Sequence, residues 1–341
     1  MNTLIIGPAW VGDMVMAQSL FILLNQRYPD VPIDVVAPAW SAGLLERMPQ
    51  VRRTVSLNVS HGQLGLGERR RVGNSLRNNY ERAIVLPTTW KSALVPWFAR
   101  IPVRTGFLGE MRYGLLTDIR DLDKSVLSMT VHRYLALGQD KPEPLPPAHI
   151  PQPHLVSSHE QQDLLCEKYT LDTTRPACVL FPGAEYGPAK QWPIEYFAEL
   201  AARLTEDGKQ VWVIGSAKDH EAGERICAAK EFAFNLCGKT SLSEAIDAVA
   251  MAKVAITNDS GLMHVAAALD VPVVALYGSS SPEKTPPLTD KKVILRQELD
   301  CAPCFERSCP LGHTDCLRSI SVDTVWEQVG LISDVILRAK V

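Results

Sequence analysis

Long apolar runs are missing from this sequence. No uninterrupted apolar stretch approaches the roughly 18 residues that a membrane-spanning helix needs. Residues 1–7 have neither the basic leader nor the apolar length of a secretory signal peptide. These absences lead us to expect a cytoplasmic protein, and in that compartment its eight cysteines would be thiols or metal ligands rather than disulfides.

A compositional bias toward disorder or fibres is also missing. Hydrophobic residues make up 46% of the chain and charged residues 21%, which is typical of a soluble globular protein. A length of 341 residues is too great for one ordinary core and suits two domains. The dinucleotide-binding pattern Gly-x-Gly-x-x-Gly does not follow the first predicted strand, where the spacing is instead Gly-x₄-Gly-Asp at residues 7–13.

Positive charge is concentrated in the first half of the chain. Residues 51–120 hold 12 basic and 4 acidic side chains, whereas the whole chain carries a net charge of −3. This bias predicts an anionic partner such as a membrane surface, a phosphorylated glycan or a nucleic acid, and surface charge that only improves solubility explains it equally well. A nucleic acid is the weakest of these, because the basic residues are not interleaved with aromatic stacking platforms.

Short β-rich runs alternate with amphipathic stretches along the chain. We predict strands at residues 3–6, 33–37, 82–86, 103–106, 178–181, 211–214, 254–256 and 273–276. We predict helices at residues 14–28, 39–48, 65–79, 92–100, 194–206, 220–229, 242–251 and 261–269. This alternation predicts an α/β fold of two doubly wound, Rossmann-like domains that face each other across a cleft.

Proline marks the expected domain boundary. Residues 141–153 contain six prolines, a density that excludes helices and sheet ladders and favours an extended linker. We therefore predict one domain at residues 1–150 and a second at 151–320. An amphipathic helix at 321–341 would pack near the domain junction.

The segment 257–264 carries the clearest chemical signal. Here Asn258, Asp259 and Ser260 supply helix-capping chemistry after a buried strand. Small residues at the start of the following helix leave backbone N–H groups open to an anion such as a pyrophosphate. His264 lies one turn later, where it would donate to a phosphate or ribose oxygen. In the simpler alternative, Asp259 is only a cap and His264 a half-buried helix residue.

Three other loops carry candidate groups. Lys190 lies on a glycine-rich loop, where it would neutralise a departing diphosphate, or would simply be solvated. Asp219 and Glu221 follow the next strand, and either carboxylate would suit ribose hydroxyls. Asp13 opens the first helix, as a general base or as a plain cap.

Together, the segments 7–14, 182–193 and 258–264 resemble the ADP-heptose:lipopolysaccharide heptosyltransferases, and 111–116 and 215–221 resemble subfamily II. The resemblance implies a GT-B fold, with the acceptor in the first domain and ADP-heptose in the second. It also implies inverting, metal-independent transfer, without a required cofactor, to the first heptose of heptosyl-Kdo2-lipid A. Transfer at another core position (types I or III) and a GT-B-fold nucleotide-sugar epimerase are the alternatives.

The resemblance implies that Asp13 is the catalytic base and that the donor is bound by Lys190, Asp259, Ser260, Gly261 and His264. Further residues are candidates because of their positions in the loops. The catalytic residues would be Asp13 and Lys190. The donor-binding residues would be Gly183, Ala184, Lys190, Asp219, Glu221, Thr240, Asp259, Ser260, Gly261 and His264. The acceptor-side residues would be Trp10, Gly12, Lys91 and Arg112. The expected protein is a monomer, peripheral to the inner face of the inner membrane, that meets a phosphorylated inner-core acceptor there and no nucleic acid.

A cysteine cluster stands apart from these motifs. Cys301, Cys304, Cys309 and Cys316 fall close together, with His313 between the last two. A Cys-x₂-Cys pair followed by Cys and His is compatible with structural zinc. The spacing after the first pair is irregular, so we favour a loop of reduced or partly oxidised thiols and expect no metal.

Overall fold

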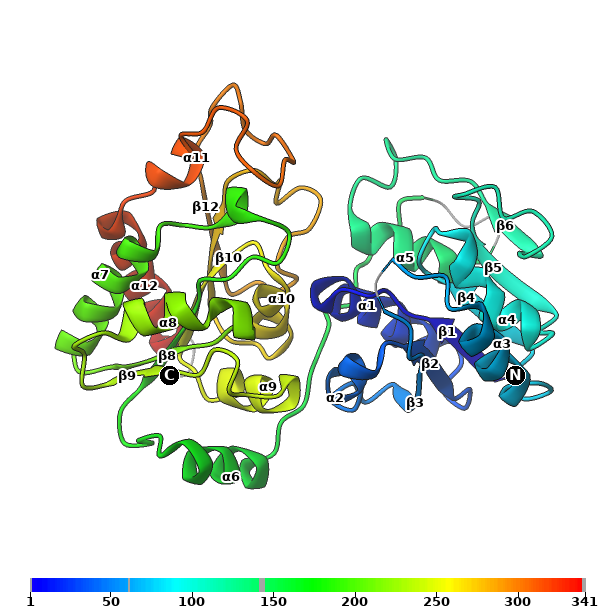
Figure 1. The fold of residues 1–341 in the computed structure, drawn as a ribbon, viewed down its shortest axis with the longest axis horizontal. Helices are drawn as coiled ribbons and strands as arrows, with labels where there is room; N and C mark the ends of the chain where they lie inside the picture. The colour runs from blue at the N-terminus through cyan, green and yellow to red at the C-terminus, as the bar shows by residue number, and fades with distance from the viewer. Residues whose placement is uncertain (1, 61, 141–144, 339–341) are drawn as a thin grey trace. The chain divides into compact units, whose positions relative to one another are not determined.

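The computed structural model describes residues 2–60, 62–140 and 145–338. The chain divides into two compact units, Met1–Leu155 and Val156–Val341, which run from blue to green and from green to red in Figure 1. This division falls a few residues beyond the predicted boundary at 150/151. The first four residues of the predicted proline-rich linker lie outside the described residues.

A six-stranded sheet forms the centre of the first unit. Its strands are β1 (Thr3–Ile6), β2 (Ile33–Ala37), β3 (Val51–Ser56), β4 (Arg82–Val85), β5 (Val103–Phe107) and β6 (Asp118–Arg120). They follow the order β3-β2-β1-β4-β5-β6, and every neighbouring pair is parallel. The strands β1, β2 and β4 are buried throughout, as expected for strands covered on both faces.

Helices connect these parallel strands. They are α1 (Val11–Arg27), η1 (Ala39–Ser41), α2 (Ala42–Leu45), α3 (Leu66–Ser75), η2 (Trp90–Ala93), α4 (Leu94–Phe98) and α5 (Thr130–Gly138). The helix α1 packs against α5, and α3 packs against α4. Two predicted helices, 39–48 and 92–100, are each split into a 3₁₀ turn and a short α-helix.

The second unit repeats the connectivity of the first. Its strands are β7 (Ala177–Phe181), β8 (Gln210–Val213), β9 (Ala233–Asn235), β10 (Val254–Asn258), β11 (Val273–Tyr277) and β12 (Lys292–Arg296). Their order is β12-β11-β10-β7-β8-β9. In both sheets the first strand is central, the next two extend to one side and the last three to the other. The predicted α/β class is confirmed, and each sheet has the switch point beside which doubly wound folds bind ligands.

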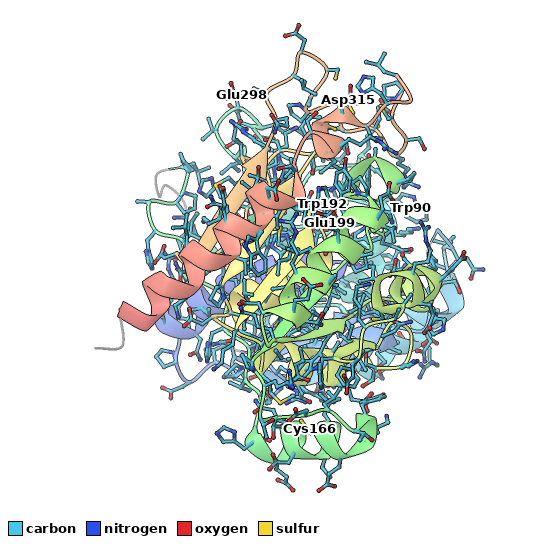
Figure 2. The ribbon with its side chains drawn as sticks, turned by 90° about the vertical axis from the view of Figure 1, so that its left-hand side faces the viewer. Trp90, Cys166, Trp192, Glu199, Glu298 and Asp315 are labelled. Carbon is cyan, nitrogen blue, oxygen red and sulfur yellow. The ribbon has the colours of Figure 1, made fainter. Side chains whose placement is uncertain are left out.

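Helices cover both faces of the second sheet. They are α6 (His159–Tyr169), η3 (Pro188–Lys190), α7 (Ile194–Glu206), η4 (Ala217–Asp219), α8 (His220–Cys227), α9 (Leu242–Ala250), α10 (Gly261–Ala268), α11 (Asp315–Arg318) and α12 (Val322–Arg338). One face packs on α7, α8 and α12, and the other on α6, α9 and α10. Trp192 is fully buried just before α7 (Figure 2).

The last helix belongs to the core of the second unit. Val322, Val325 and Val329 of α12 are buried in the same apolar cluster as α7, and the two helices lie side by side in Figure 2. Residues 339–341 of the predicted helix lie outside the described residues. Among the described helices, none combines the length and the apolar character that crossing a membrane requires.

Candidate functional site

The turn between β10 and α10 lies at the carboxyl end of a central strand. Ser260, the residue before α10, has an extended backbone, and its side chain makes no capping hydrogen bond within the described part of the chain. Its hydroxyl instead lies 3.4 Å from the Thr257 hydroxyl. The backbone N–H groups that open α10 are therefore not occupied by a Ser260 cap, and the helix dipole favours an anion beside them.

Asn258 fixes a second loop against this turn. Its Oδ1 accepts a hydrogen bond from the Trp192 backbone N–H at 3.0 Å, and its Nδ2 donates to the Pro182 carbonyl at 2.7 Å. Asn258 is fully buried, so these bonds satisfy an amide that water does not reach. They tie both ends of residues 182–192, which we call the lysine loop, to the end of β10. The sequence indicated only a capping residue here.

Lys190 and Asp259 form an ion pair beside the start of α10. Lys190 Nζ lies 2.5 Å from Asp259 Oδ2, and the two side chains are 17% and 6% exposed. The simpler interpretation of Asp259 as only a helix cap is therefore wrong, because its carboxylate pairs with a cation from another loop. A phosphate that enters this corner would meet a lysine already held in place.

His264 lies within the same corner and is only 4% exposed. Burial lowers its pKa, the charge of Asp259 opposes this, and the charge of Lys190 adds to it, so that the pKa lies at about 4. The imidazole is therefore neutral near pH 7. A neutral imidazole still donates one hydrogen bond, so contact with a phosphate or ribose oxygen stays a prediction.

Gly183 brings the Asp219 carboxylate against the lysine loop. A Cβ atom at Gly183 would lie 2.5 Å from Asp219 Oδ1, so any side chain here would displace the carboxylate from this position. The other carboxylate oxygen, Oδ2, accepts from the backbone N–H and the hydroxyl of Ser216, both at 2.8 Å. Glu221 is exposed in the first turn of α8. The structure thus places Asp219 beside the lysine loop, and the choice of ribose partner stays a prediction.

Two further predicted donor residues lie on neighbouring turns. Ala184 is buried in the lysine loop, directly after Gly183. Thr240 is half-buried and immediately precedes Ser241, the N-cap of α9. Both follow the carboxyl ends of strands in the second sheet, and their contact with a donor stays a prediction.

Asp13 lies in the first turn of α1, at the carboxyl end of β1. Its side chain is half-buried, whereas Gly12 is buried and Trp10 is 43% exposed. Tyr134 of α5 is a neighbour that the sequence did not indicate. Burial raises the pKa of Tyr134 well above its ordinary value, and the negative charge of Asp13 raises it further. A neutral phenol therefore lies close to the predicted base.

Lys91 lies on η2, after β4. Its Nζ donates to the Gln63 carbonyl at 3.3 Å. On the other side, the Trp90 backbone N–H donates to Glu110 Oε2 at 3.0 Å. The loops that follow β3, β4 and β5 are therefore linked side by side, with Lys91 in the middle one.

Arg112 is buried inside the first unit. It is 1% exposed, and its guanidinium donates to the carbonyls of Phe107 and Pro87 at 2.5 and 2.8 Å and to the Ser92 hydroxyl at 3.1 Å. Burial lowers its pKa to about 10. In the described conformation, these protein groups occupy the guanidinium, which is buried and not exposed to solvent. The burial of a loop arginine cannot be inferred from sequence alone.

Large apolar side chains are exposed in the loops after the carboxyl ends of the first unit's strands. They lie after β1, β2, β3, β4 and β5 in turn, and are Trp10, Trp40, Leu64, Trp90, Met111 and Tyr113, between 39% and 79% exposed. Because all these strands are parallel, the loops belong to one edge of the sheet, which we call the apolar rim. Asp13 and Lys91 lie on the same edge.

The cluster of four cysteines forms one compact loop, residues 301–316, which we call the cysteine loop. All four thiols and His313 line a cavity of about 20 Å³. Backbone hydrogen bonds, led by that of Thr314, lower the pKa of Cys309. Burial and the neighbouring cysteines raise the pKa of Cys316. Within the described residues, no group of three or more His, Cys, Asp or Glu side chains is placed to hold a metal ion.

Comparison with known proteins gives the family. Residues 69–315 match the model of glycosyltransferase family 9 (heptosyltransferase). Lipopolysaccharide heptosyltransferase 2 of Salmonella typhimurium is 52% identical over 96% of this chain and 97% of its own length. Lipopolysaccharide heptosyltransferase 1 of Pseudomonas aeruginosa is 27% identical over 92% of this chain and 89% of its own length.

A solved structure agrees with both sheets. The E. coli ADP-heptose lps heptosyltransferase II is similar to this chain with a TM-score of 0.89 and 45% identity, and 100% of each chain is covered. The two Rossmann-like sheets and the family resemblance expected from the sequence motifs are confirmed. The chain therefore belongs to glycosyltransferase family 9, the heptosyltransferases.

Proposed function

We propose that this chain transfers L-glycero-D-manno-heptose from ADP-heptose to the first heptose of the lipopolysaccharide inner core. The observation that carries the proposal is the Lys190–Asp259 ion pair at the start of α10, in a chain 52% identical to a lipopolysaccharide heptosyltransferase 2. The corner offers a fixed cation and a helix terminus, the two groups that a leaving diphosphate needs.

In this proposal the second unit binds ADP-heptose. The diphosphate lies at Ser260 and Gly261, beside Lys190, with His264 as a neutral hydrogen-bond donor. The close approach of Asp219 to Gly183 favours Asp219 over Glu221 as the ribose partner, with Ala184 and Thr240 on the adjacent turns.

Transfer is a single displacement with inversion at the anomeric carbon. Asp13 accepts the proton of the acceptor hydroxyl while its oxygen forms the new bond to the anomeric carbon. The bond from that carbon to the diphosphate oxygen breaks, and ADP leaves with the electron pair. Lys190 and the first N–H groups of α10 stabilise the charge that develops on ADP. In this mechanism no metal or other cofactor is required.

The first unit binds the acceptor. Trp10 and the other side chains of the apolar rim supply flat surfaces for sugar rings, and Lys91 supplies a charge for phosphate or carboxylate groups. The basic surplus of residues 51–120 would hold the protein, as a monomer, at the anionic inner face of the inner membrane. Arg112 supports this surface from within and does not contact the acceptor.

Product mass after incubation with ADP-heptose tests the proposal. We expect one heptose to be added to mono-heptosylated Kdo2-lipid A. If only the heptose-free acceptor gains mass, the chain is a type I enzyme. If the donor is consumed without any acceptor, the chain is not a transferase of this kind.

A further inference from the structure

The cysteine loop contacts the lysine loop through its backbone. The Ala189 N–H donates to the Arg307 carbonyl at 3.0 Å. The Tyr186 hydroxyl donates to the Phe305 carbonyl at 2.7 Å. Two consecutive turns of the lysine loop are therefore fixed to one short stretch of the cysteine loop, directly before Lys190.

Gly187 allows the two loops to approach closely. A Cβ atom at this position would lie 2.3 Å from the Arg307 carbonyl oxygen, closer than such atoms ever approach. The neighbour is backbone, which cannot turn aside as a flexible side chain can. Any side chain at Gly187 would therefore separate the loops, so this contact is specified by the sequence.

Tyr186 connects the cysteine loop to Lys190. Lys190 Nζ lies 5.1 Å from the centre of the Tyr186 ring, and the Arg307 guanidinium lies 5.3 Å from it. Cations near an aromatic face are attracted to it. The Tyr186 hydroxyl is fixed by the cysteine loop, so the ring has a set position beside the lysine that would meet the diphosphate.

The cysteine loop is itself held from several sides. Its Phe305 N–H donates to the Ser279 carbonyl, after β11, at 2.6 Å. The cavity that its four thiols surround is also lined by Ala189 of the lysine loop and by Ser279. Backbone N–H groups of residues 311–314 converge on Cys309. The four cysteines, the carboxyl end of β11 and the lysine loop are therefore in continuous contact.

We propose that the cysteine loop is a positioning element that holds Tyr186, and through it Lys190, at the donor diphosphate. This inference rests on the proposed function of Lys190 and gives the cysteine cluster a role in donor binding that requires no metal. The thiols do not touch the donor. They maintain the shape of the loop against which the lysine loop is fixed.

ADP binding to a Tyr186→Phe chain tests this inference. The substitution removes one hydroxyl hydrogen bond and keeps the ring, so the chain should fold normally. We expect the Kd for ADP, measured by calorimetry, to rise about two- to tenfold, and the KM for the donor to rise with it. Tyr169→Phe is the matched control, because its hydroxyl donates to the Lys239 carbonyl at the same 2.7 Å elsewhere in this unit.

A double substitution shows whether Tyr186 acts through Lys190. In a Lys190→Ala background, Tyr186→Phe should cause no further loss of ADP affinity, since the group it positions is absent. A purely structural role would instead lower the unfolding midpoint and leave ADP affinity unchanged. If Tyr186→Phe binds ADP as tightly as Tyr169→Phe does, the positioning role is excluded.

Substitutions at Cys309 test the thiol side. We expect Cys309→Ala to weaken ADP binding, and Cys309→Ser to restore part of it, because a hydroxyl oxygen accepts the same N–H groups. Cys166→Ala is the control, since this thiol lies on α6, at the opposite end of the unit from Asp315 of the cysteine loop (Figure 2). Equal ADP affinity in all three chains would overturn the proposal. Failure of the unmodified chain to bind ADP would overturn the proposed function, and this inference with it.

Discussion

The two units have the same strand connectivity but differ in the side chains at the carboxyl ends of their strands. At the carboxyl end of the first sheet, each of five strands is followed by a large apolar side chain that is at least 39% exposed. At the corresponding end of the second sheet, the polar groups of Asn258, Asp259 and His264 are at most 7% exposed. The fold therefore provides the frame, and the strand-end residues decide what each unit binds.

This contrast has a physical meaning for ligand binding. Polar groups that already have a partner, such as the half-buried Lys190 with the buried Asp259, lose little freedom when a small charged ligand arrives. Exposed rings such as those of Trp90 and Tyr113 contribute binding free energy when a ligand buries their apolar surface. This suits a larger, amphipathic partner. The first pattern fits a nucleoside diphosphate sugar, and the second fits a lipid-linked glycan.

Among these substitutions, Asp13→Asn in the first unit should lower the turnover rate most. Loss of a general base lowers turnover by about two to four orders of magnitude, so kcat should fall by that factor at saturating ADP-heptose. Initial rates with the mono-heptosylated acceptor measure this. Turnover close to that of the unmodified chain would remove Asp13 from the role of base.

Lys190→Ala in the second unit should have the next largest effect on kcat. Removing one group that stabilises the developing charge lowers kcat by about two to three orders of magnitude. The matched control is Lys168→Ala, which removes a lysine also paired at 2.5 Å, with Glu244, on the outside of the same unit. Steady-state rates should separate the two variants clearly. Similar rates for both would show that Lys190 is only half of a structural ion pair.

The burial of His264 predicts a pH dependence that belongs to the second unit. The unfolded chain binds a proton near pH 6.5 and the folded chain only near pH 4, so stability falls as pH falls through this window. The loss amounts to roughly 3 kcal/mol in the free energy of unfolding. Denaturant unfolding at pH 7.5 and at pH 4.5 measures it. A His264→Gln chain should lose less stability over this range, and an identical loss would contradict the assignment.

Substitutions on the apolar rim should have the smallest effect on catalysis, and they test whether the rim binds the acceptor and not the donor. The double change Met111→Ser and Tyr113→Ser should raise the KM for the acceptor roughly three- to tenfold, because apolar contact area is lost. ADP affinity should stay the same. Leu331→Ser, which changes a 59% exposed residue of α12, serves as the control. A rise in KM with the control as well would mean that the effect is not specific to the rim.

The sequence predicts the buried parts of the fold and misses its edges. Eight predicted strands correspond to β1, β2, β4, β5, β7, β8, β10 and β11. The four missed strands, β3, β6, β9 and β12, are the outer strands of the two sheets. An edge strand lacks cover on one side, so it does not need the continuous apolar run that identifies a central strand. β3 illustrates this, because both Arg52 and Arg53 lie within it.

The sequence predicts a site residue when the role of that residue depends on the segments directly before and after it. Asp259 and Ser260 are recognisable because a strand ends and a helix begins around them. Asn258, Tyr134 and Tyr186 acquire their roles from segments distant in sequence, which no local pattern records. Arg112 shows a further limit, since the sequence places it among the acceptor-side residues and gives no sign that the fold buries it.

Titration of ADP into the Asp13→Asn and Lys190→Ala chains tests most directly whether the two units bind different reactants. If the second unit holds the donor, Asp13→Asn should bind ADP within about twofold of the unmodified chain. Lys190→Ala should bind it at least about tenfold more weakly, since a charge-assisted hydrogen bond is lost. Equal weakening in both chains, or weakening in Asp13→Asn alone, would contradict the account.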